Sequence, residues 1–112
     1  SIKDVVLHLC DAERVFGYRL LRFARGDATN LPGFDEGTYV RHGGADARTL
    51  ADLAEEFAAV RRATLWLITP LDDEAMSRVG MANNHPVSAR ALAWIMAGHA
   101  AHHARVLRER YL

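Results

Sequence analysis

The chain has 112 residues, half of them apolar, and its fourteen basic residues balance its fourteen acidic residues. This length fits one domain, and we expect residues 1–112 to form a single domain around one core. A net charge of zero argues against a nucleic-acid or anionic-membrane partner. No stretch approaches the ~20 continuous apolar residues that span a bilayer, and no signal peptide is visible, so we expect a cytoplasmic protein.

The first element is a long amphipathic helix, predicted over residues 2–25. Gly26 follows as a helix stop. The single cysteine, Cys10, lies inside the apolar run, where we expect a buried and inert thiol. The helical pattern is already under way at Ser1, so we expect a fragment that lacks an N-terminal element. The apolar residues recur every three or four positions, the helical period: Val5, Leu9, Ala12, Phe16, Leu20 and Phe23.

A loop is predicted next, over residues 27–46, because one proline and several glycines interrupt the helical period. Leu31, Phe34 and Tyr39 are expected to hold this loop against the core. Long loops in small domains are often functional, and we expect this one to shape a pocket.

The second long helix is predicted over residues 48–67. At its start, Thr49 and Asp52 resemble a capping box with aspartate in place of glutamate. The connection that follows, residues 72–86, is expected to contain only a short helical turn near residues 74–77.

The last helix is predicted over residues 88–110, with Ser88 as its N-cap just after Pro86. Three long helices and no alternating β pattern predict an all-α helical bundle.

Two histidines of this last helix, His99 and His103, lie one turn apart. On a wheel of ~100° per residue, both lie ~20° from the centre of the apolar stripe, whereas His102 lies ~80° away. Two buried imidazoles are costly unless their nitrogens are satisfied, and one divalent cation satisfies both. We therefore expect a metal-binding pair, with a hydrogen-bonded or surface pair as the alternative.

His8 is the best candidate for a third ligand, because it lies on the inner flank of the first helix. Three neutral nitrogens leave a metal ion its charge and an open position, the layout of a catalytic site. Asp11, one turn from His8, is a candidate to orient it, with a solvated surface aspartate as the alternative. His42 and His85 lie in loops, where exposed polar residues are ordinary. Residues 99–103 lack the glutamate of the HExxH motif, so the base of zinc proteases is absent.

Segments spread over the whole chain support one family resemblance: residues 2–5, 8–14, 31–36, 85–88, 98–99, 102–103 and 107–111. These segments resemble the DinB/YfiT-like family of helical metal-binding domains. The resemblance implies a four-helix bundle, of which this chain holds three long helices and lacks the family's first. It also implies a three-histidine metal site, which falls by motif position on His8, His99 and His103.

Two classes of function follow from the residues and the resemblance. The first is a metal-dependent enzyme, either a hydrolase or a transferase that activates a low-molecular-weight thiol. Relatives of this bundle include thiol-dependent transferases and isomerases. In this interpretation the ion is zinc or nickel, the fourth position takes water or a thiolate, and Asp11 and Glu36 are the candidates for a general base.

The alternative is a non-catalytic domain, in which the metal stabilises a small bundle or which serves as a binding module. A purely structural site would be closed by a fourth protein ligand, for which His42, His85 and Glu36 are the candidates. Bundles of the family are often dimeric, so a homodimer is also expected.

Overall fold

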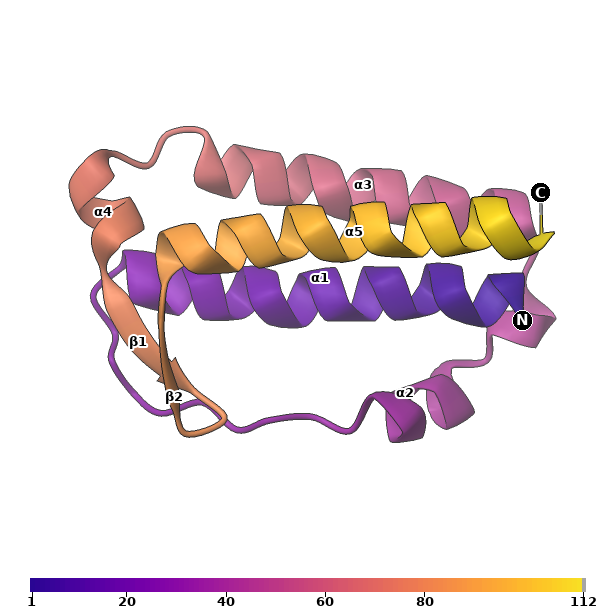
Figure 1. Ribbon diagram of the computed structural model, residues 1–112, viewed down its shortest axis with the longest axis horizontal. Coiled ribbons are helices and arrows are strands. Elements are labelled where there is room, and N and C mark those ends of the chain that lie inside the picture. Colours follow the sequence, from indigo (N-terminus) through magenta and orange to yellow (C-terminus); the bar gives the residue numbers. More distant parts are fainter. Residues whose placement is uncertain (112) are drawn as a thin grey trace.

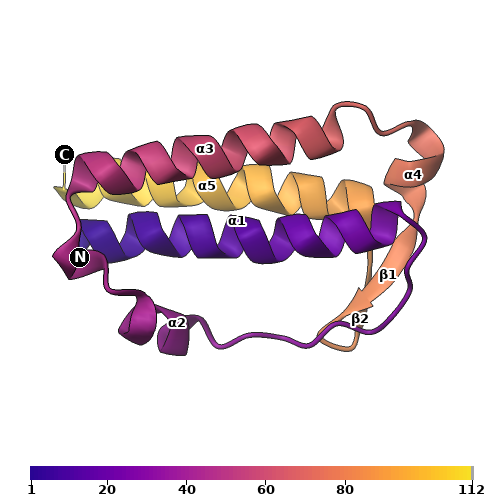
Figure 2. The same cartoon turned by 180° about the vertical axis from the view of Figure 1, so that it is seen from behind.

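Three long helices, α1, α3 and α5, form the body of the protein in the computed structural model, which describes residues 1–111. The predicted all-helical bundle is confirmed, with a small hairpin added. Helices α3 and α5 lie one behind the other on one side of α1, and α2 lies on its other side (Figures 1 and 2). The elements are α1 (Ile2–Ala24), α2 (Glu36–Gly43), a 3₁₀ turn η1 (Ala45–Ala47), α3 (Leu50–Ile68), α4 (Asp73–Ser77), β1 (Val79–Ala82), β2 (His85–Ser88) and α5 (Ala89–Tyr111).

Helices α3 and α5 begin at side-chain caps, as the sequence predicts. The Thr49 hydroxyl accepts a hydrogen bond from the backbone N–H of Asp52 over 3.1 Å, and Ser88 accepts one from Ala91 over 3.0 Å. Each bond satisfies one of the free N–H groups of a first turn. After the C-terminal end of α1, Gly26 has a φ of +82°, a left-handed conformation that stops the helix at little steric cost.

The core lies along α1, which packs against both α3 and α5. Two clusters of buried side chains share this helix. The first joins Leu20, Phe23, Ala24, Leu31 and Ala82 to Ala89, Leu92 and Met96, and the second joins Leu7 and Cys10 to Ala45 and Leu53. Burial raises the pKa of the Cys10 thiol to about 11, which agrees with the predicted inert cysteine.

The loop predicted for residues 27–46 contains a helix, α2, so this part of the prediction was wrong. Asp35 caps it by accepting a hydrogen bond from the N–H of Thr38 over 3.2 Å, and Gly44 ends it with a φ of +73°. None of the eight residues of α2 is buried. A helix without a buried face leaves no apolar period in the sequence, which explains the omission.

The prediction also missed the hairpin of β1 and β2, which pair in antiparallel fashion. Its two-residue turn consists of Asn83 and Asn84, with φ values of +50° and +66°. Asparagine tolerates this conformation, which a two-residue hairpin turn requires. Strands of four residues are too short to show a clear alternation. Gly80 is required in β1, because a Cβ there would lie 2.0 Å from a ring carbon of Phe23.

The hairpin anchors the segment that leads to α2. Leu31 donates its N–H to the carbonyl of Met81 over 2.9 Å, and Asn83 donates to the carbonyl of Leu31 over 2.8 Å. From this anchor the chain runs alongside α1 to α2 (Figure 1).

None of the helices within residues 1–111 is both long and apolar enough to cross a membrane.

Candidate metal centre

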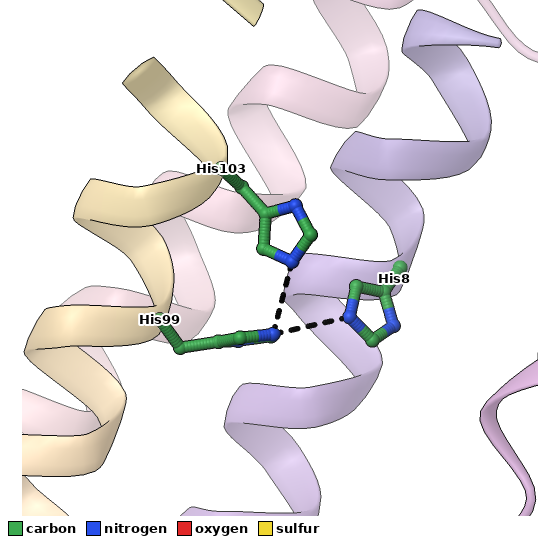
Figure 3. Close-up of side chains that lie close together, drawn as sticks. All are labelled: His8, His99 and His103. Carbon is green, nitrogen blue, oxygen red and sulfur yellow. Dashed lines mark hydrogen bonds between the residues drawn. The ribbon is translucent and has the colours of Figure 1, made fainter. Parts of the chain in front are cut away.

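Three histidines from the first and last long helices meet at one point (Figure 3). His8 comes from α1, and His99 and His103 come from adjacent turns of α5. The ring centroid of His8 lies 5.0 Å from that of His99 and 5.1 Å from that of His103. The structure therefore brings together the three residues that the sequence predicts as ligands.

The ring nitrogens of this trio are close enough to hold one metal ion. The Nε2 atom of His99 lies 3.2 Å from Nε2 of His8 and 3.1 Å from Nε2 of His103. One nitrogen from each of the three rings can be chosen so that all lie within 4.8 Å of one another. Nitrogens bound tetrahedrally to zinc at about 2.0–2.1 Å are about 3.3 Å apart, close to the two short separations.

Hydrogen bonds between the rings cannot pair all three nitrogens well, because Nε2 of His99 faces two nitrogens at once (Figure 3). A neutral imidazole nitrogen carries either one proton or one lone pair, so it makes one good N–H···N bond. A cation placed between the rings uses the lone pairs of all three nitrogens. The donor set therefore fits a first-row divalent ion, for which neutral imidazole is a common ligand.

The electrostatics of the site favour neutral rings. Burial lowers the pKa of His99, and the neighbouring His8 lowers it further. The pKa of His103 is lowered in the same way, first by burial and then by His99. Neutral imidazole is the form that coordinates metals, so the folded chain holds these two residues ready for binding.

A hollow of about 280 Å³ opens beside the trio, and its walls come from α1, α2 and α5. His8 and His103 line it on one side, and Glu36, Gly37 and Val40 of α2 line it on the other. The helix that the sequence analysis missed is therefore a wall of the site. The only sequence signal for it was the pair Asp35 and Glu36, a capping residue followed by an acid at a helix N-terminus.

The two acidic residues predicted near the site lie in different surroundings. Glu36 is exposed and shares the hollow with His8 and His103. Asp11 is half-buried, and within residues 1–111 it forms no hydrogen bond with His8. Burial raises the pKa of Asp11, and a charge on His8 lowers it by a smaller amount.

The other histidines lie outside the trio. His102 is exposed, as its place on the helical wheel predicts. Nδ1 of His42 lies 2.9 Å from the carbonyl oxygen of Thr38, and Nδ1 of His85 lies 2.7 Å from that of Asn83. Both side chains contact backbone carbonyls of their own turns, and neither belongs to the group that could hold a metal ion in the described part of the chain.

Comparison with known proteins identifies a family for this chain. A family model described as the DinB superfamily matches residues 1–107, which is nearly the whole chain. This confirms the resemblance drawn from the sequence. No curated protein and no solved structure matches the chain.

Proposed function

The chain belongs to the DinB superfamily, and on this premise we propose that His8, His99 and His103 bind one divalent metal ion. The observation that carries this proposal is the convergence of three imidazole nitrogens from α1 and α5. Zinc and nickel are the ions we expect, because both accept neutral imidazole ligands.

We further propose that the site is catalytic, as a metal-dependent hydrolase or a thiol-dependent transferase. Three protein ligands leave a position for an exchangeable one, and the hollow beside His8 and His103 gives it access. A bound divalent ion lowers the pKa of a water or thiol at that position towards neutral pH.

Glu36 is the residue we assign to proton transfer in this reaction. Its carboxylate is exposed, and it lines the same hollow as two of the proposed ligands. The charge of Glu36 also acts on His99 and His103, raising the pKa of each against the larger effect of burial. Asp11 is the second candidate, although it does not line that hollow.

A structural role for the metal is the competing proposal. The trio joins the first and last helices, so a bound ion would cross-link the two ends of the chain. Metal binding of this kind contributes directly to folding. A closed structural site has four protein ligands, and the group found within residues 1–111 has three. This difference favours the catalytic proposal.

Cobalt(II) substitution separates the two proposals, because its visible and near-ultraviolet absorption reports coordination number and thiolate ligation. An open site predicts that 2-mercaptoethanol adds a sulfur-to-cobalt charge-transfer band to the spectrum of the cobalt protein. The His8→Ala variant should lose the original cobalt spectrum. A spectrum that thiol and azide both leave unchanged would overturn the catalytic proposal and support a closed site.

A further inference from the structure

Arg19, in the C-terminal half of α1, is a buried cation without a carboxylate partner in the described chain. Its relative exposure is 8%. The guanidinium lies 5.7 Å from the ring centroid of Phe16 and 5.8 Å from that of Phe34, and its Nη2 donates a hydrogen bond to the carbonyl of Pro32 over 2.9 Å. No ion pair within residues 1–111 includes Arg19.

The remaining nitrogens of Arg19 face accessible space. Within residues 1–111, every fully buried side-chain nitrogen or oxygen has a hydrogen-bond partner. Nη2 is the nitrogen of Arg19 that bonds to protein, so Nε and Nη1 must reach solvent. Arg19 lines a cavity of about 330 Å³ between α1 and residues 31–39, so this cavity is open space that the side chain borders.

The charge of Arg19 is uncompensated by the protein. The other arginine in the cavity wall, Arg14, is 2.6 Å from Glu56. Glu56 also pairs with Arg48, which in turn pairs with Asp52, so two carboxylates balance those two arginines. Burying an unpaired cation is unfavourable, and contact with two aromatic rings offsets only part of that cost. Burial accordingly lowers the pKa of Arg19. One bound monoanion would balance the charge, and a carboxylate matches the paired donors of a guanidinium.

The rest of the cavity wall is apolar or aromatic, from Val15, Leu31, Phe34, Tyr18 and Tyr39. A volume of this size lies at the lower end of the range for small-molecule sites, about 300–1,000 Å³. Such a wall suits the hydrocarbon or aromatic body of a small ligand, with the charged group at Arg19. A phosphate ester would need more uncompensated positive charge than this wall provides.

We propose that this cavity binds a small organic acid, with its carboxylate on Arg19 and its apolar body between α1 and residues 31–39. The cavity and the hollow at the histidines lie along the same side of α1, and consecutive residues, Tyr39 and Val40, line one each. Val15 and His8 are seven residues apart, about 10 Å along a helix. This last step rests on the proposed metal-dependent function. In that case the carboxylate at Arg19 belongs to one end of a substrate, and the reacting group at its other end lies at the histidines.

The test uses 4-phenylbutyrate as the probe and its uncharged amide, 4-phenylbutanamide, as the matched control. Binding is followed by amide chemical shifts of the ¹⁵N-labelled protein, with and without zinc. The acid should bind at least ten-fold more tightly than the amide, with the largest shifts at residues 18, 19, 31, 33 and 34. Arg19→Gln should remove this preference, and Arg25→Gln, a change at an exposed arginine, should keep it.

Several results would overturn the inference: equal binding of acid and amide, a preference that persists in Arg19→Gln, or binding that requires zinc. If Arg19→Gln does not fold, judged by circular dichroism, the acid–amide comparison and the shift map of the unmodified chain still decide. Zinc is titrated separately. Zinc binding without a preference for the acid overturns this inference alone, whereas a preference for the acid without zinc binding overturns the proposed function alone.

Discussion

His99 occupies the centre of the proposed metal site. Its Nε2 is the atom that contacts both other rings, and the edge of Phe16 packs beside it with the two ring centroids 6.2 Å apart. Its neighbour His102 is one of the exposed residues of the same helix. His102 is therefore a matched control for substitution of His99. Both are histidines of α5, but only His99 belongs to the proposed site.

We expect His99→Ala to weaken zinc binding by more than about 100-fold. Loss of an outer partner of a metal ligand already costs roughly 10–100-fold, and His99 is itself a proposed ligand. His102→Ala should bind zinc as the parent does. A competition titration with a chromogenic chelator measures both affinities. Equal losses in the two variants would contradict the assignment of His99.

Acid should destabilise the metal-free protein from about pH 6.5 downwards. The pKa values of His99 and His103 are lowered in the folded chain from an ordinary value of 6.5, mainly by burial. Below pH 6.5 the unfolded chain binds protons that the folded chain resists, so the free energy of unfolding falls as the pH falls. The loss is complete once the pH lies below both folded-state pKa values.

Urea unfolding at pH 7.5 and 5.5, in the presence of EDTA, measures this dependence. The variant His99→Gln/His103→Gln carries neither titrating group and should lose less stability between the two pH values. A parent protein that is more stable at pH 5.5 than at pH 7.5 would show that these two groups do not dominate.

The proposed ligand residues could be predicted from the sequence, whereas the place of Arg19 in the cavity could not. The spacing of His99 and His103 and their place on the apolar stripe are properties of one helix, so a helical wheel is sufficient to find them. Arg19 is one of many arginines, and what distinguishes it is the pair of rings and the Pro32 carbonyl. Those partners come from a segment whose path depends on the hairpin, which local sequence does not reveal.

At the level of elements, α1 and α3 are joined by a buried ion pair. Both oxygens of the Glu13 carboxylate accept hydrogen bonds from Arg61, over 2.6 and 2.8 Å. The side chain of Glu13 is only 3% exposed and that of Arg61 is 31% exposed. Two parallel bonds of this kind fix the relative position of the helices as well as stabilising them.

Arg61→Met should lower the free energy of unfolding by about 3 kcal/mol. The substitution leaves the Glu13 carboxylate buried and unpaired, which typically costs about 3–5 kcal/mol, and partial exposure of this pair places the effect at the lower end. Arg62→Met, at the neighbouring exposed position, should change the stability by no more than about 0.5 kcal/mol. Urea unfolding of both variants measures the difference. Equal effects would contradict a structural role for the pair.

The sequence predicted the long helices well, because each buries an apolar stripe with the helical period. It located their ends to within about two residues, from the caps at Thr49 and Ser88 and the stop at Gly26. It failed for α2 and for the hairpin. The former buries no side chain, and the latter is held by contacts with Leu31, more than forty residues earlier in the chain. Elements stabilised by distant contacts leave little local signal.

For the whole molecule, the site links the two ends of the chain. His8 lies near the start of α1, and His99 and His103 lie near the middle of α5, whereas α3 contributes no residue to the trio. A metal bound there joins the two helices, so binding and folding are coupled.

Elemental analysis of the purified, untagged protein tests the central claim most directly, with the His99→Ala/His103→Ala variant measured alongside. We predict about one equivalent of zinc or nickel in the parent protein, and none in the variant. Circular dichroism of both samples ensures that the comparison is between folded chains. A parent protein that contains no metal, even after reconstitution with either ion, or a variant that retains the same amount, would contradict the proposed metal centre.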